Sequence, residues 1–171
     1  MKTTRSLLPL IFIFFCTRSL GQEYLFTTEE LENLPVFNSI EKAKKNPEKV
    51  YKLVFYYQNL TTVPQEITLF QNLQMLDLGE NKITELSPEL FELKNLQILG
   101  LSHNQLKEIP PDIGKLKNLK ELIIWNNQLK DLPKEIKELK KLKVLELKDN
   151  PIPIENQKKI KELLPDTKIM F

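Results

Sequence analysis

The sequence holds little of the side-chain chemistry on which many enzyme classes depend. Its 171 residues include one cysteine, Cys16, and one histidine, His103. A single cysteine excludes an intramolecular disulfide framework. One histidine and one cysteine also leave few ligands for a metal centre and few groups for thiol catalysis. The glycines number only four, and they form no glycine-rich loop of the kind that cradles phosphate groups.

A strong charge of one sign is absent as well, and so is a long apolar run. The chain has 25 Lys and Arg residues against 23 Asp and Glu residues, and its formal net charge of +2 gives no electrostatic signature of nucleic-acid binding. The apolar run at residues 7–15 is too short to cross a bilayer as a helix, which needs roughly 20 residues.

The first 21 residues have the pattern of a secretory signal peptide. Two basic residues precede the apolar run, and residues 19–21 form a small-x-small site, which predicts cleavage before Gln22. The protein is therefore expected in the periplasm, on the cell surface or in the medium. Cys16 leaves open a lipidated N-terminus, although Phe15 before it is larger than lipoprotein processing normally accepts.

Removal of residues 1–21 changes the charge balance of the chain. It leaves 22 basic and 23 acidic residues, a net charge of −1, so no electrostatic attraction to nucleic acid or anionic lipid is expected. The mature chain then has no cysteine and no transmembrane segment. We expect its stability to come from a hydrophobic core, with no cofactor and no disulfide.

Leucine-like residues recur with a period of 23 from Val50 onward. The pattern is L-x-x-L-x-L-x-x-N-x-L followed by x-x-L-P-x-x-I-x-x-L-x-x. Over the five core positions of five units, 24 of 25 residues are of the expected type, so the period is not a chance feature; Gln58 is the exception. The five units begin at Val50, Leu73, Leu96, Leu119 and Leu142.

The spacing within a unit predicts its local structure. Leucines two residues apart point to the same side of a short strand. The asparagine that follows can bond to backbone groups of adjacent coils that would otherwise be buried unpaired. The second half of a unit suits a short helix or 3₁₀ turn. The asparagines predicted to stack as an internal ladder are Asn81, Asn104, Asn127 and Asn150.

Because no unit can bury its leucines alone, the units are expected to stack into an α/β solenoid. The pattern resembles the leucine-rich repeat family over about residues 50–154. The resemblance implies a horseshoe with a parallel sheet on its concave side and short helical or 3₁₀ segments on its convex side. The outer half of the unit and the C-terminal sequence also resemble the small exported leucine-rich repeat proteins of Leptospira-type spirochaetes.

Both ends of a solenoid need closing, and the flanking sequences predict helical caps. We assign residues 22–49 to an N-terminal cap, because 27–30 and 38–41 both have the spacing of a capping box. The repeats end at residue 154, since Glu155 replaces an aliphatic residue of the pattern. Residues 155–171 form the predicted C-terminal cap, with a helix from about Glu155 to Leu164.

Side chains at positions 3, 5, 7 and 8 of each unit are expected to project from the concave sheet. Several are larger and more apolar than a solvated face requires, and exposed aromatic clusters mark interaction surfaces. The alternative is that these side chains simply cover one another on the strands. The residues predicted to bind a partner are Tyr56, Tyr57, Met75, Ile98, His103, Ile123 and Trp125.

Two other interpretations of this face, a hydrolase site and a metal site, have less support in the sequence than partner binding. Ser102, His103, Asp77 and Glu80 contain hydrolase residue types, but Ser102 and His103 are sequence neighbours whose side chains tend to diverge, and no oxyanion donors are evident. His103 with Glu80 would offer a metal only two ligands, so an ordinary exposed histidine is the preferred interpretation. We expect no catalytic, cofactor or metal site.

The sequence thus predicts an exported, non-catalytic protein-binding module. The spirochaete resemblance implies a host cell-surface or matrix protein as partner, in an adhesin-like role. The alternative is a structural or self-associating protein of the bacterial envelope. A monomer is expected in the first case, and a concentration-dependent mass in the second.

Overall fold

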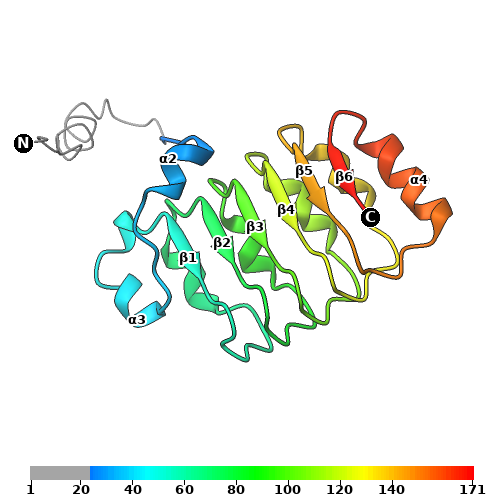
Figure 1. Ribbon diagram of the computed structural model, residues 1–171. Helices are drawn as coiled ribbons and strands as arrows, with labels where there is room; N and C mark the ends of the chain where they lie inside the picture. Colours follow the sequence, from blue (N-terminus) through cyan, green and yellow to red (C-terminus); the bar gives the residue numbers. More distant parts are fainter. Residues whose placement is uncertain (1–23) are drawn as a thin grey trace, which may run out of the picture.

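The computed structural model describes residues 24–171 (Figure 1). The predicted signal peptide lies outside these residues, as do the first two residues of the predicted N-terminal cap. Within them, six short strands form one parallel sheet in the order β1-β2-β3-β4-β5-β6. The strands are β1 (Lys52–Val54), β2 (Met75–Asp77), β3 (Ile98–Gly100), β4 (Glu121–Ile123), β5 (Val144–Glu146) and β6 (Lys168–Met170).

The 23-residue period fixes the register of the sheet. In the four pairings among β1 to β5, each residue lies beside the residue 23 positions later, so that Leu53 lies beside Leu76, and Leu76 beside Leu99. These central leucines are fully buried and form one row of the core. The equal spacing means that equivalent side chains from successive units stack directly on one another, as a solenoid requires.

A second layer of 3₁₀ turns lies behind the sheet (Figure 1). Each turn begins either at a proline or directly after one, and the fixed φ angle of proline suits the entry into a helical turn. The architecture confirms the predicted solenoid with a parallel sheet on one side and 3₁₀ segments on the other. The turns are η1 (Pro47–Lys49), η2 (Gln65–Leu69), η3 (Pro88–Glu92), η4 (Pro111–Lys115) and η5 (Lys134–Glu138).

Two short helices, α2 (Thr28–Glu32) and α3 (Ile40–Ala43), precede the first strand. Helix α2 begins at the predicted capping box, in which Thr27 and Glu30 satisfy each other's backbone N–H groups. The second predicted box is wrong, because helix α3 is capped by Ser39 and has no side-chain capping bond. The N-cap position is occupied one residue later than the spacing suggested.

The C-terminal segment contains a helix and an additional strand. Helix α4 (Ile154–Leu163) spans nearly the predicted residues, with Ile160 buried against the core. Strand β6 follows it and pairs with β5, placing Ile169 beside Leu145. We did not predict this strand, because it lacks the leucine and asparagine pattern of the repeats. It covers the edge that β5 would otherwise expose.

The asparagines at the strand ends hold neighbouring coils together. The side-chain amide of Asn104 donates to the carbonyl groups of Leu78 and Leu101, at 2.9 and 3.1 Å, and accepts from the N–H of Ile83 at 2.9 Å. Asn81, Asn127 and Asn150 make equivalent bonds in their own coils. The carbonyl groups directly after strands β1 to β5 therefore have side-chain partners.

Candidate protein-binding surface

The seven predicted partner-binding residues lie on the concave side in three separate clusters. Tyr56 and Tyr57 contact each other at the N-terminal end of the sheet. His103 and Trp125 contact each other where β3 and β4 end. The three aliphatic residues, Met75, Ile98 and Ile123, line a hollow beside helix α2.

Trp125 is held in place by the histidine of the preceding coil. The ring centroids of His103 and Trp125 are 4.1 Å apart, with the rings edge to face at 74°. His103 is in turn positioned by Glu80, whose Oε1 lies 3.4 Å from its Nε2, and by Asn126, whose amide donates to its Nδ1. The indole is partly exposed, so a rigid aromatic edge faces solvent.

The residues at repeat position 8 share an unusual backbone conformation. Their φ angles lie between 51° and 55°, in the left-handed region that non-glycine residues rarely adopt. No glycine stands at this position in any unit, so the sequence carried no signal for it. Two neighbours of this row, Glu80 and Asn126, both contact His103, which lies in the coil between them. The residues concerned are Tyr57, Glu80, His103, Asn126 and Asp149.

The two tyrosines form the most exposed aromatic pair of the concave side. Their ring centroids are 5.5 Å apart, and Tyr57 is 70% exposed against 40% for Tyr56. The charge of Glu80 raises the pKa of Tyr57. The ring of Tyr56 lies directly over Gly79, where a Cβ atom would come within 2.7 Å of a ring carbon. Glycine at position 79 is therefore required for this placement of Tyr56.

The carboxyl group of Asp77 lies on the same part of the sheet. Burial raises its pKa, an effect partly offset by a hydrogen bond from the N–H of Gly79 at 2.9 Å. Its Oδ1 would lie 2.7 Å from a Cβ atom on Gly100. The small residue in the next strand thus leaves room for a half-buried carboxylate on the concave face.

Helix α2 covers part of the face that the sequence predicted to be open. It lies at the end of the sheet where the strands begin (Figure 1), and its Leu31 is buried beside the hollow that Met75, Ile98 and Ile123 line. Nothing in the sequence of the helix indicated this position. The aliphatic part of the predicted binding patch is thus shared with the chain's own N-terminal segment.

Two buried glutamines tether this segment to the sheet. The amide of Gln74 donates to the carbonyl of Tyr24 at 2.7 Å and accepts from the N–H of Phe26 at 2.9 Å. The amide of Gln97 donates to the carbonyl of Phe26 at 2.9 Å and to Gln74. Because both glutamines are about 1% exposed, these bonds are shielded from competing water.

The residues considered for chemistry are not brought into a catalytic or metal-binding arrangement. Ser102 is only 4% exposed, which restricts the approach of a substrate to its hydroxyl group. Across residues 24–171, no three His, Cys, Asp or Glu side chains gather closely enough to hold a metal ion. Over the same residues, no helix has the length and apolar character needed to cross a membrane.

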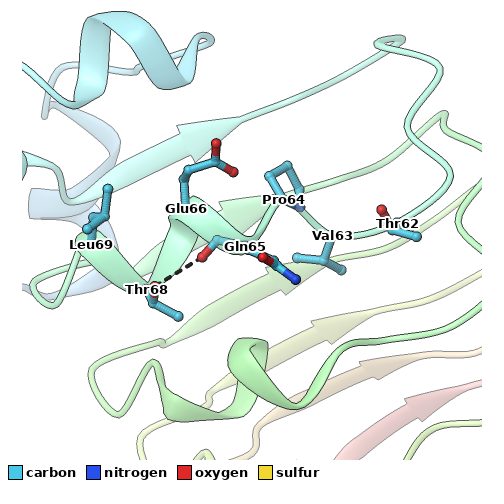
Figure 2. A pocket seen from close by; sticks show the side chains of 7 residues that line it. All are labelled: Thr62, Val63, Pro64, Gln65, Glu66, Thr68 and Leu69. Carbon is cyan, nitrogen blue, oxygen red and sulfur yellow. Dashed lines mark hydrogen bonds between the residues drawn. The ribbon is translucent and has the colours of Figure 1, made fainter.

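A larger hollow lies on the opposite side of the molecule, at η2. Figure 2 shows that the seven side chains around it belong to one continuous segment, residues 62–69. The hydroxyl group of Thr68 is already bonded to the carbonyl of Gln65, at 3.0 Å. Because no other element contributes a side chain, we regard this hollow as an open surface and not as a binding site.

The comparisons with known proteins decide the family. Residues 48–106 and 94–152, together more than half of the chain, match the family described as leucine rich repeat. The chain belongs to the leucine-rich repeat family. Members of this family are typically non-catalytic binding modules. No curated protein matches the chain.

Solved structures extend this result. A leucine-rich repeat protein of Leptospira interrogans is 41% identical, with a TM-score of 0.74, over 86% of this chain and 40% of that chain. The internalin InlF of Listeria monocytogenes is 26% identical, with a TM-score of 0.62, over 72% of this chain and 35% of that one. The present chain thus spans about two fifths or less of the length of these relatives.

A plant receptor also has this fold over part of its length. The ectodomain of the Arabidopsis thaliana receptor kinase GASSHO1/SCHENGEN3, in complex with CASPARIAN STRIP INTEGRITY FACTOR 2, is 39% identical, with a TM-score of 0.52. The match covers 58% of this chain and 12% of that chain. The resemblance to leucine-rich repeat proteins is confirmed, including that to a protein of Leptospira.

Proposed function

We propose that this protein is an exported, non-catalytic binding module whose concave sheet recognises a host cell-surface or matrix protein, in an adhesin-like role. The observation that carries the proposal is the Trp125–His103 cluster, a partly exposed aromatic pair held by Glu80 and Asn126 on a rigid sheet. Large aromatic side chains with little freedom to move are favoured anchors of protein interfaces.

The comparisons support two parts of this proposal separately, namely export from the cell and the binding role. The likeness to a Leptospira protein, together with the predicted signal peptide, supports export from a bacterium. The receptor ectodomain forms a complex with another named factor, which supports a binding role for a protein with this fold. A binding role also suits a rigid solenoid, which presents its side chains without a conformational change.

The test is capture of host proteins by the immobilised protein from extracts of cell surface and extracellular matrix. Two variants with the same new charge are compared: Trp125→Glu on the concave side and Leu69→Glu on η2, where Leu69 is 51% exposed. Circular dichroism checks that both remain folded. We expect the native protein and Leu69→Glu to capture the same partner, and Trp125→Glu to lose it.

Capture of the same partner by Trp125→Glu would show that the concave side is not the binding surface. The envelope alternative makes a different prediction, which light scattering can measure on the same samples. If no host protein is captured, and the native protein has a concentration-dependent mass that Trp125→Glu abolishes, the face serves self-association and the host-binding proposal is wrong.

A further inference from the structure

We infer that the partner of the proposed concave site inserts an arginine or lysine side chain into the hollow between helix α2 and the sheet. The inference rests on the proposed function and names the chemistry that the partner must present. The hollow measures about 350 Å³, near the lower end of the roughly 300–1,000 Å³ typical of small-ligand sites. This space suits one or two side chains of a partner better than a whole secondary-structure element.

The floor of the hollow is apolar. Met75, Ile98 and Ile123 of three successive strands are each partly exposed there, and Leu31 of α2 closes one side. A flexible methionine adapts its shape to an inserted chain, while the branched isoleucines provide a fixed surface. The aliphatic stem of an inserted side chain therefore has an apolar surface to pack against.

The rim of the hollow carries unpaired negative charge. Glu121 at the start of β4 and Glu32 at the end of α2 both line it. Within residues 24–171, neither carboxylate has a basic nitrogen within 4.0 Å. One cation, Lys52, also lines the hollow, but this residue is buried and its ammonium group donates to the carbonyl of Glu32 at 3.2 Å. Lys52 thus secures the end of α2.

The charged side chains around the hollow on the concave side are also mostly negative. In the first four repeats they carry Asp77, Glu80 and Glu121 against the buried Lys52 alone; the further concave lysines, Lys148 and Lys168, come after the fourth repeat. A partner with a basic side chain would be attracted over a distance of about a Debye length, roughly 8 Å at physiological salt. The charge complementarity therefore selects a basic partner.

Arginine and lysine match the two parts of the hollow at once. Their aliphatic stems pack on apolar surface while their charged ends remain at a polar rim. An aspartate or glutamate would be repelled by Glu121 and Glu32. A purely apolar side chain would displace water from these carboxylates without offering them a partner, which is unfavourable.

The test uses the methionine methyl groups of the protein as reporters. Met75 lines the hollow, whereas Met170 lies in β6, four strands away, and serves as an internal control. Protein labelled with ¹³C at the methionine methyl groups is titrated with the peptide acetyl-Ser-Gly-Arg-Gly-Ser-amide. Matched peptides carry lysine, norleucine or glutamate in place of the arginine.

We expect the arginine and lysine peptides to shift the Met75 signal saturably and to leave Met170 unchanged. Norleucine has a similar stem without the charge, and we expect it to bind about tenfold more weakly. Glu121→Gln should weaken arginine binding about fivefold, the loss of one partly exposed ion pair. Glu108→Gln, an exposed carboxylate outside the hollow, should leave the affinity within about twofold of native.

Equal binding of the arginine and norleucine peptides, or no saturable shift of Met75, would overturn the inference. Capture from host extracts by Glu121→Gln tests the inference of a basic side chain separately from the proposed function. A partner lost by Trp125→Glu, combined with no Met75 response, overturns the basic side chain and leaves the proposed function standing. A specific Met75 response without any captured partner supports the hollow as a basic-group site and overturns only the proposed function.

Discussion

At the scale of single residues, the buried asparagine amides join one coil to the next. Each amide bonds to backbone groups of its own strand and of the preceding coil, as Asn104 does with Leu101 and Leu78. These groups lie in the interior, where a missing partner costs about 1–3 kcal/mol each. The repeat sequence predicted this role, because a polar residue that recurs at a strand end inside a leucine pattern can satisfy backbone groups that would otherwise be buried without partners.

Asn104→Ala should lower the free energy of unfolding by about 3 kcal/mol, because it leaves the buried N–H of Ile83 and the carbonyl of Leu78 without their side-chain partner. Urea unfolding monitored by circular dichroism measures the loss. The matched control is Asn118→Ala, which removes two solvent-exposed bonds, one to the carbonyl of Lys94 and one from the ammonium group of Lys141, and should cost less than about 1 kcal/mol. Equal losses would contradict the account.

The left-handed conformation at position 8 predicts a substitution that raises the free energy of unfolding. Asp149 has a φ angle of 55° and is exposed. Asp149→Gly should raise the free energy of unfolding by about 0.5–1 kcal/mol, because glycine adopts this conformation without steric cost. Lys148→Gly, next to it, should be neutral or destabilising in the same urea measurement. A loss of stability in Asp149→Gly would show that the φ angle carries no cost.

At the scale of elements, the packing of helix α2 on the concave side was the feature hardest to predict. The capping box of Thr27 and Glu30 marked where the helix begins, since that motif involves only residues close in sequence. Its position on the sheet depends on Gln74 and Gln97, which bond to Phe26 across 48 and 71 residues of sequence. A glutamine at position 2 of a repeat carries no local signal of such a bond.

Gln74→Ala should detach the segment that precedes α2 without unfolding the repeats. Because two backbone groups lose a buried partner, amide exchange over residues 24–32 should accelerate by about 30-fold, equivalent to roughly 2 kcal/mol of local stability. Hydrogen exchange read by mass spectrometry reports each segment separately. Gln105→Ala, at an exposed position, is the control and should leave the exchange unchanged. Unchanged exchange in Gln74→Ala would show that the helix is held by other contacts.

At the scale of the whole molecule, the constant period determines the architecture. Equal spacing gives strands β1 to β5 the same register, so the leucines of the five units form continuous buried rows. This is why a repeat counted in the sequence predicted the solenoid. The sixth strand escaped prediction because its pairing with β5 follows from the position of the C-terminal helix, and its own residues lack the repeat pattern.

Ile169→Asp should release β6 and expose the edge of β5 that it covers. Ile169 is partly buried and packs against the core beside Leu145, and a carboxylate there should lower the free energy of unfolding by about 2 kcal/mol. The uncovered edge of β5 should also promote association, which size-exclusion chromatography with light scattering detects. Lys168→Asp changes an exposed side chain of the same strand and should leave the protein monomeric. A monomeric Ile169→Asp with native stability would contradict a protective role for β6.

The measurement that tests the central claim most directly is the equilibrium dissociation constant of a captured host partner for the native protein, Trp125→Glu and Leu69→Glu. If the Trp125–His103 cluster anchors the interface, Trp125→Glu should weaken binding about 30-fold or more, the loss typical of a hot-spot residue, roughly 2 kcal/mol. Leu69→Glu should bind within about twofold of native, because surface changes outside an interface are nearly neutral. A native affinity for Trp125→Glu, or a comparable loss in Leu69→Glu, would contradict recognition through the concave face.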